Sequence, residues 1–373
     1  MTKFLRDSIS KLPWLYFIAS YSIIKFFSLF PGFYLRGIHP VGQNSCLAIE
    51  AGEKGWDNIE FKEMYSSAIE FFGEKRVKKI VIDKSKPYIA QIKSNLHSTN
   101  ITHYLYDPRT GSQDYFVGGI ESLRIALLFA RYRVVPIVYL TDLSVRKSRC
   151  QASAVSALNG LVVTFMLPKL VKTIFPHERL IGPSLMPFSI KTLEHLKSLR
   201  LNLQQSGEMQ NLIRFTGSLY EPRSSFLMKF SEGLAESEHS VEILGRVNGV
   251  RVSDNEYWNR IISSSIVITT ADQCIQPGLD LRWIPHLVYR YLEVMASGSL
   301  LLAYPAPGVS RYFEPDKHFV SYKSLDEAIE KARFYLENPK ELDLIRLAGH
   351  QKAETLIRTH SFWVQIDTAL GLF

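Results

Sequence analysis

After residue 40 the chain alternates short apolar runs with amphipathic stretches. This alternation is typical of βα units that build a parallel sheet. In the first half, strands are predicted in the segments 47–49, 80–82, 102–106, 134–142, 160–165 and 179–185. Helices are predicted near 61–72, 119–132, 148–158 and 190–199.

A second series of the same kind follows a polar segment. Residues 201–211 carry a glycine and little apolar periodicity, which is typical of a linker. Strands are then predicted at 212–220, 241–246, 266–272 and 299–305, and helices at 223–234, 257–263, 289–295, 324–338, 341–358 and 362–370. We therefore expect an α/β protein with two Rossmann-like domains facing a cleft, comprising residues 41–205 and 206–373. A chain of 373 residues is long enough for two such domains of comparable size.

The N-terminal segment, residues 1–40, is apolar and is expected to lie outside the two domains. Its core, 14–33, is interrupted by Lys25 and by Pro31-Gly32 and is preceded by basic residues. The length fits a signal-anchor, while a lysine among aromatic residues fits a helix lying in a membrane surface, and a buried helix is the third alternative. We expect a cytoplasmic protein, and attachment to the inner face of a membrane through this segment is one of the alternatives. Whether the segment spans, lies on or avoids the membrane is left open.

The composition favours some classes of binding partner over others. Hydrophobic residues make up 46% and charged residues 21%, and the net charge is +8 with a pI near 9.2. A basic balance favours anionic partners such as nucleotide diphosphates, nucleic acid or an acidic membrane surface. The lysines and arginines are spread along the chain without interleaved aromatic stripes, which argues against nucleic acid. The three cysteines form no CxxC pair and no Asp-x-Asp occurs, so neither a metal site nor a cofactor is expected.

Three polar clusters follow predicted strands of the first half, at 50–56, 106–113 and 141–149. Open parallel sheets bind ligands at these strand ends. In the first cluster Gly52 and Gly55 would let a diphosphate or an acceptor approach the backbone.

Acid–base candidates lie in the other two clusters and in one strand. Asp107 and Asp142 each end a strand, with Arg109 and Arg146 close by. A carboxylate so placed can deprotonate an acceptor hydroxyl, and the alternative is that each aspartate caps a turn and pairs with its arginine. His103 lies inside a predicted strand, where a core or edge histidine is the alternative to a catalytic base.

The most informative stretch is 289–305, a predicted helix that delivers the chain to a buried strand. Gly298 suits the position after the helix that requires a positive φ. Glu293 stands among apolar residues in mid-helix, where a carboxylate needs a defined partner unless it faces solvent.

The string from 289 onwards resembles the E-A-x-A-x-G-x-P segment of GT-B glycosyltransferases. It is more similar to the CgeB-like, or group 1, glycosyltransferases, which carry R-x-x-E before a turn of small residues, then a phenylalanine-rich loop, a strand ending in tyrosine and a late histidine. Arg290 with Glu293, Tyr312-Phe313, 319–322 and His360 match these features in order. The segment 215–223, FTGSLYEPR, is a further anchor.

The resemblance implies a donor site for a nucleoside-diphosphate sugar in the second domain. Glu293 would bind the ribose hydroxyls, a role that suits a carboxylate. Backbone N–H groups around Gly298 and after Gly308 would hold phosphate or sugar. Gly217 and Ser218 would let the backbone approach the diphosphate.

Two further positions bear on the chemistry of the donor. Arg223 would supply positive charge to the leaving group. Many retaining GT-B enzymes carry another glutamate at the position that Pro285 occupies here, so the anomeric outcome and the sugar stay open. Arg282 and His286 lie nearby and offer other contacts to the sugar.

The function expected is transfer of a sugar to an acceptor hydroxyl, without a metal, in the synthesis of a surface glycan or glycoconjugate. The acceptor would be a glycan, a lipid-linked saccharide or a protein. The alternatives are a sugar-nucleotide epimerase of the same fold and a non-catalytic protein that binds nucleotide or glycan.

Overall fold

The computed structural model describes the parts of the chain from 46 to 371 that form its sheets and helices. These are residues 46–53, 59–83, 85–98, 100–106, 115–140, 155, 158–172, 179–235, 240–245, 252–270 and 286–371, together with Ala19, Ser22, Ile23 and Phe26. They fall into two compact units. Unit 1 comprises residues 1–184 and 362–373, and unit 2 comprises residues 185–361.

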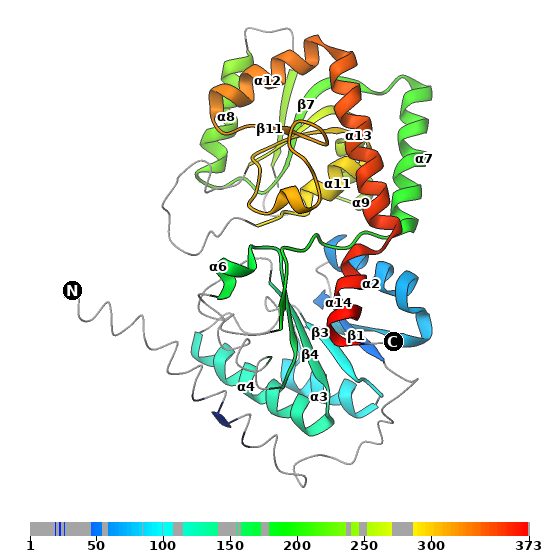
Figure 1. The fold of residues 1–373 in the computed structure, drawn as a ribbon, viewed down its shortest axis with the longest axis vertical. Coiled ribbons are helices and arrows are strands. Elements are labelled where there is room, and N and C mark those ends of the chain that lie inside the picture. The colour runs from blue at the N-terminus through cyan, green and yellow to red at the C-terminus, as the bar shows by residue number, and fades with distance from the viewer. Residues whose placement is uncertain are drawn as a thin grey trace, which may run out of the picture. The chain divides into compact units, whose positions relative to one another are not determined.

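Unit 1 contains a six-stranded parallel sheet in the order β2-β1-β3-β4-β5-β6 (Figure 1). The strands are β1 (Leu47–Glu53), β2 (Val77–Ile82), β3 (His103–Tyr106), β4 (Val135–Leu140), β5 (Leu161–Thr164) and β6 (Leu180–Ile181). All four residues of β5 are buried, as in a parallel strand covered on both faces. The expected parallel α/β architecture is confirmed for this half.

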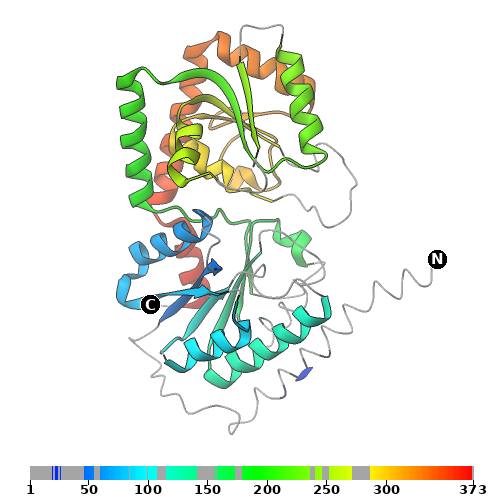
Figure 2. The same cartoon turned by 180° about the vertical axis from the view of Figure 1, so that it is seen from behind.

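The helices of unit 1 are α2 (Ile59–Phe72), the short η2 (Glu74–Arg76), α3 (Tyr88–Ser98), α4 (Tyr115–Tyr132), α6 (Pro168–Lys172) and α14 (Ser361–Leu370). α3 and α4 lie side by side (Figure 2). α14 joins this unit from the far end of the sequence by packing on α2. Trp363 is fully buried there, and its Nε1 donates to Ser67 Oγ at 2.9 Å.

Unit 2 contains a five-stranded parallel sheet in the order β11-β10-β9-β7-β8. The strands are β7 (Gln210–Gly217), β8 (Ser240–Gly245), β9 (Ser264–Thr269), β10 (Leu300–Ala303) and β11 (Val320–Ser321). Its helices are α7 (Ile190–Ser206), α8 (Arg223–Leu234), α9 (Asp254–Ile262), α11 (Arg290–Ser297), α12 (Leu325–Glu337) and α13 (Pro339–Arg358), with the short η4 (Val309–Arg311).

Helices cover both faces of the second sheet (Figure 1). α8 packs with α12 on one face, over a core that includes Phe215, Phe230 and Ala328. On the other face α11 packs against α7, α9 and α13. The sheet is therefore buried between two helical layers, which leaves the strand ends as the places where polar groups can gather.

The division between the units differs from the boundary expected at 205/206. α7 runs on to Ser206 and belongs to unit 2, because its packing partners are α9, α11 and α13. Only Leu193 and Leu196 of α7 are buried, so its last turns face solvent and show no apolar periodicity. Residues 201–206 of this exposed helical end form the first part of the segment 201–211 that was predicted to be a linker. Gly207, with a φ of 72°, then ends the helix.

Apart from four isolated residues, the apolar segment 14–33 lies outside the described residues, as does most of the helix predicted at 148–158. Among the residues that are described, no helix combines the length and the apolar character needed to cross a bilayer.

Candidate nucleotide site at the carboxyl ends of the second sheet

The chain changes direction across the second sheet at β7. β8 lies on one side of β7 and β9 on the other, and the two strands are consecutive in sequence. In open parallel sheets, ligands bind outside the carboxyl ends of the strands at such a switch point. The side chains that gather at the ends of β7 and β9 are therefore the first candidates for a binding site.

Arg223, the first residue of α8, links the ends of these two strands. Its Nε donates to Thr270 Oγ1 at 3.0 Å, and its Nη1 donates to the Ser218 carbonyl at 3.2 Å. The guanidinium carbon lies 4.3 Å from the centre of the Tyr220 ring, within the range of a cation–π contact. Arg223 thus places a fixed positive charge at the switch point.

Arg290 and Glu293 lie in the first turn of α11 and meet Tyr257 of α9. The Glu293 carboxylate is only 5% exposed. Its Oε1 accepts from the Tyr257 hydroxyl at 2.7 Å, and its Oε2 lies 3.5 Å from Arg290 Nη1. Arg290 also donates from Nη1 to Tyr257 Oη at 2.6 Å and from Nη2 to the Thr216 carbonyl at 2.7 Å. The partner expected for a carboxylate in this apolar helix is therefore present, and the cluster is tied to the end of β7.

Glycines keep the ends of β7 and β8 open. Gly217 and Gly245 are register partners at the last positions of the two strands. A Cβ at Gly217 would lie 3.2 Å from Phe215 Cζ and 3.6 Å from Arg290 Nη2, and its φ of 156° favours glycine. A Cβ at Gly245 would lie 2.5 Å from a methyl group of Leu219. The absence of a side chain at Gly245 lets Leu219, in the loop after β7, approach the end of β8, whereas at Gly217 a Cβ would crowd only Phe215.

Gly298 and Gly308 occupy different ends of the sheet. Gly298 ends α11 with a φ of 77°, so the positive φ expected there is confirmed. It lies at the opposite end of α11 from Glu293, and its N–H donates to the Met295 carbonyl within the helix end. The structure therefore does not bring Gly298 to the cluster. Gly308, with a φ of 87°, precedes η4 in the loop that leaves the carboxyl end of β10.

Most acceptor-side candidates of the first unit lie outside the described residues. These are Gly55, Asp107, Arg109, Asp142 and Arg146, and on the donor side Arg282 and Pro285.

The remaining candidates of unit 1 lie within its sheet. Gly52 belongs to β1, at an irregularity of the β1–β2 register between Glu50 and Glu53. His103 is the first residue of β3, about 10 Å from the carboxyl end of that four-residue strand. Burial lowers the pKa of His103 to about 4, and Thr102 Oγ1 lies 3.0 Å from its Nδ1. The structure thus places His103 at the other edge of the sheet from the strand ends that precede Asp107 and Asp142.

A buried carboxylate in unit 1 was not singled out from the sequence. Glu50 of β1 is fully buried, and its Oε1 accepts from Tyr88 at 2.5 Å and from Tyr104 at 3.0 Å. Burial and the neighbouring Glu50 raise the pKa of Tyr104 well above its usual value. The sequence offers no periodic signal for this contact, because Glu50 and Tyr104 come from different strands.

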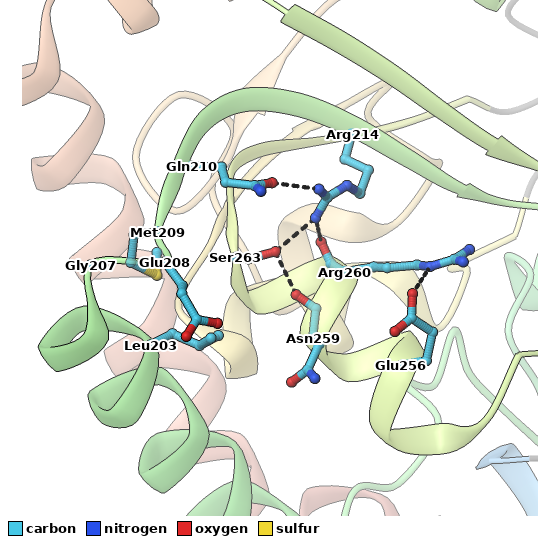
Figure 3. A pocket seen from close by; sticks show the side chains of 10 residues that line it. All are labelled: Leu203, Gly207, Glu208, Met209, Gln210, Arg214, Glu256, Asn259, Arg260 and Ser263. Carbon is cyan, nitrogen blue, oxygen red and sulfur yellow. Dashed lines mark hydrogen bonds and ion pairs between the residues drawn. The ribbon is translucent and has the colours of Figure 1, made fainter.

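A pocket of about 380 Å³ lies at the opposite, amino-terminal edge of the second sheet (Figure 3). It is lined by Leu203, Gly207, Glu208, Met209, Gln210, Arg214, Glu256, Asn259, Arg260 and Ser263. The Arg214 guanidinium donates to Gln210 Oε1, to the Arg260 carbonyl and to Ser263 Oγ, as Figure 3 shows, and also to Glu242. These bonds commit Arg214 to holding β7, β8 and α9 together, so the pocket adds nothing to the cluster around Glu293.

Two residues of the site at the carboxyl ends of β7 and β9 were not predicted from the sequence. Tyr257 contacts Glu293 and Arg290, and Thr270 accepts from Arg223. One signal for Tyr257 was present: Ser253 followed three residues later by Glu256 is a helix-start pattern. Ser253 does cap α9, accepting from the Glu256 N–H at 3.2 Å. This start places Tyr257 in the first turn of the helix, at the carboxyl edge of the sheet.

The comparisons with known proteins agree with this fold. Residues 223–368 match the model of the Glycosyl transferase-like family. No curated protein matches the sequence. HepE from Anabaena, solved in complex with UDP and glucose, is similar with a TM-score of 0.59 and 13% identity, over 88% of this chain and 100% of that chain. The same protein in complex with UDP-glucose gives 0.56 and 12%, with the same coverage.

A glycosyltransferase from Rickettsia africae is similar with a TM-score of 0.55 and 9% identity, over 88% of this chain and 99% of that chain. At these identities the likeness shows the fold, two parallel α/β sheets as in GT-B glycosyltransferases. The segment that matches the Glycosyl transferase-like model, residues 223–368, includes Arg223, Tyr257, Arg290 and Glu293, so the cluster lies within the matched part of the chain.

Proposed function

We propose that the protein transfers a sugar from a UDP-sugar to an acceptor hydroxyl and that unit 2 binds the donor. The observation that carries this proposal is the pairing, at one switch point, of a buried carboxylate with two arginines. Glu293 lies beside Arg290, and Arg223 and Arg290 both donate to carbonyl groups at the end of β7. A nucleoside diphosphate presents the complementary groups, a ribose diol and a diphosphate.

Each group of the cluster has a chemical role in this proposal. Glu293 accepts hydrogen bonds from the ribose hydroxyls. The glycine at 217 and the backbone of Ser218 allow close approach of the diphosphate. Arg223 stabilises the negative charge that develops on the UDP leaving group as the glycosidic bond breaks. A metal ion is then not required, because fixed positive charge already stands at the leaving group.

On the acceptor side, loops that follow strands of unit 1 bind the acceptor and supply the base. Asp107 or Asp142 serves as the base that takes the proton of the acceptor hydroxyl in an inverting reaction. Arg109 and Arg146 assist in binding the acceptor, and Gly52 and Gly55 let it approach the backbone. The acceptor class proposed is a glycan, a lipid-linked saccharide or a protein.

The donor assignment is tested by binding. UDP, GDP and CMP are titrated into the full chain while its melting temperature is followed, since a ligand that binds the native state raises that temperature. We expect UDP to give the largest rise and Glu293→Ala to abolish it. Glu330→Ala, on the exposed side of α12, is the matched control. Absence of a rise with every nucleotide would remove the proposal.

The reaction is tested with UDP-glucose and UDP-N-acetylglucosamine. A transferase releases UDP when an acceptor is present and also, slowly, by transfer to water. An epimerase instead returns a UDP-sugar of altered configuration, which anion-exchange chromatography with standards separates. Loss of UDP release in Asp107→Asn or Asp142→Asn, with nucleotide binding retained, would assign the base; full release in both variants would exclude both residues.

A further inference from the structure

Tyr257 contacts both charged residues of the donor cluster although it belongs to a different helix. Its hydroxyl lies 2.7 Å from Glu293 Oε1 and 2.6 Å from Arg290 Nη1. The capped start of α9 holds Tyr257 in the first turn of that helix. The Arg290 guanidinium also lies over the Tyr257 ring, 5.4 Å from its centre. Three elements, α9, α11 and β7, therefore meet at this one hydroxyl and its two partners.

The directions of these hydrogen bonds follow from the donors and acceptors. A guanidinium can only donate, so the Tyr257 oxygen must accept from Arg290. A tyrosine hydroxyl has a single proton, and that proton is then available for Glu293. The order of donation is Arg290 to Tyr257 to Glu293, which suits an ionised carboxylate as the final acceptor.

The backbone anchors this chain of hydrogen bonds. Arg290 Nη2 donates to the Thr216 carbonyl at 2.7 Å, one residue before Gly217. The hydrogen bonds through Arg290 and Tyr257 therefore fix the orientation of the Glu293 carboxylate relative to the end of β7, where the diphosphate is proposed to bind. A carboxylate offers about four acceptor positions, so accepting from Tyr257 does not prevent it from accepting from ribose hydroxyls as well.

We propose that Tyr257 is a positioning residue that holds Glu293 in the orientation that recognises the ribose hydroxyls. This inference rests on the proposed function, since it takes a nucleotide as the ligand of Glu293. Holding the carboxylate before the ligand arrives lowers the ordering cost of binding, and the gain is confined to the ribose hydroxyls that Glu293 contacts. A role limited to fastening α9 to α11 would instead affect every nucleotide equally.

The experiment compares UDP with 2′-deoxy-UDP by isothermal titration calorimetry on the full chain. In the parent protein we expect UDP to bind about tenfold more tightly than 2′-deoxy-UDP, the effect of one well-made hydrogen bond to a charged group. Tyr257→Phe keeps the ring and removes the hydroxyl. We expect it to weaken UDP about tenfold and to weaken 2′-deoxy-UDP, which offers Glu293 one hydroxyl fewer, by a clearly smaller factor. Tyr335→Phe, in α12, is the matched control and should change neither.

A second background separates loss of positioning from a general disturbance of the fold, because a folding defect caused by Tyr257→Phe would weaken UDP binding in both backgrounds. Glu293→Gln preserves the size of the side chain but lacks the charge, so we expect Tyr257→Phe to have no further effect on UDP affinity in that background. Equal weakening of both nucleotides by Tyr257→Phe, or an unchanged preference for UDP, would overturn the positioning role while the proposed function stands. If the parent protein binds neither UDP nor 2′-deoxy-UDP, both proposals fall together.

Discussion

Arg290 and Arg223 donate hydrogen bonds to the carbonyl groups of the two residues that flank Gly217. Arg290 reaches the carbonyl of Thr216 at 2.7 Å, and Arg223 reaches that of Ser218 at 3.2 Å. One arginine begins α8 and the other begins α11, so the end of β7 is held by helices that follow different strands. The strand end therefore stands between two guanidinium groups, with a glycine at its centre.

Substitution of Gly217 tests whether this strand end must stay open. Gly217→Ala adds a Cβ that lies 3.2 Å from Phe215 Cζ and 3.6 Å from Arg290 Nη2. We expect a loss of about 1 kcal/mol of unfolding free energy from the backbone conformation and the tight contact. UDP affinity should fall at least tenfold, because the added methyl group occupies the strand end at which the diphosphate is proposed to approach the backbone. Urea unfolding and calorimetric titration measure the two effects.

The control for this change is Gly207→Ala. Gly207 has a φ of 72°, so it carries a similar backbone cost, but nothing lies within 4 Å of the added Cβ at the end of α7. It should lose comparable stability and bind UDP normally. If both alanine variants bind UDP like the parent protein, the open strand end has no part in nucleotide binding.

Arg223→Lys separates charge from geometry. A lysine retains the positive charge but cannot donate to both the Thr270 hydroxyl and the Ser218 carbonyl with a planar fork. We expect UDP affinity to fall about tenfold, while uridine, which lacks phosphate, should bind with less than a twofold change. Titrations with uridine, UMP and UDP measure this dependence on phosphate.

A matched control is Arg333→Lys in α12, because Arg333 also donates to a backbone carbonyl, that of Gly233, on the exposed surface. It should leave all three affinities unchanged. Equal losses for uridine and UDP in Arg223→Lys would place Arg223 in the scaffold of the site and not at the phosphates.

The sequence predicted those features that depend on local pattern. The parallel strands follow from apolar runs, and the positive φ of Gly298 follows from its place after a helix that meets a buried strand. The need of Glu293 for a partner follows from its apolar neighbours. The identity of that partner does not, because Tyr257 is 36 residues away and reaches Glu293 only when α9 and α11 pack together. The return of α14 to the first unit is hidden for the same reason, since its docking on α2 depends on residues almost 300 positions apart.

The stability of unit 2 should depend on pH through Glu354 of α13. Hydrogen bonds from Lys197 of α7 and from Arg358 lower the pKa of this carboxyl to about 2. A carboxyl group whose pKa is lower in the folded state contributes stability that is present above its unfolded pKa, near 4.5, and is lost as the pH falls towards 2. We therefore expect the unfolding free energy to decrease over this window.

Glu354→Gln should flatten that part of the pH profile and reduce stability at pH 7, where the ionised carboxylate makes its contacts. The change in unfolding free energy will be modest because the Lys197–Glu354 ion pair is partly exposed to solvent. Glu330→Gln on α12 is the control and should leave the profile unchanged. Parallel pH profiles for the parent protein and Glu354→Gln, measured by urea unfolding, would contradict the assignment.

The docking of α14 on unit 1 can be tested at one buried hydrogen bond. Trp363 is fully buried, stacks edge-on against Phe72 and donates to Ser67 Oγ. Ser67→Ala leaves the buried indole N–H without this acceptor, which costs about 1–3 kcal/mol.

A double variant tests whether this cost comes from the hydrogen bond. Trp363→Phe removes the donor together with part of the ring. In the Trp363→Phe background the further change Ser67→Ala should therefore cost clearly less, and the difference is the coupling energy of the pair. Hydrogen exchange of the α14 amides reports each effect at the helix itself, and additive losses in the double variant would show that the hydrogen bond does not hold α14 in place.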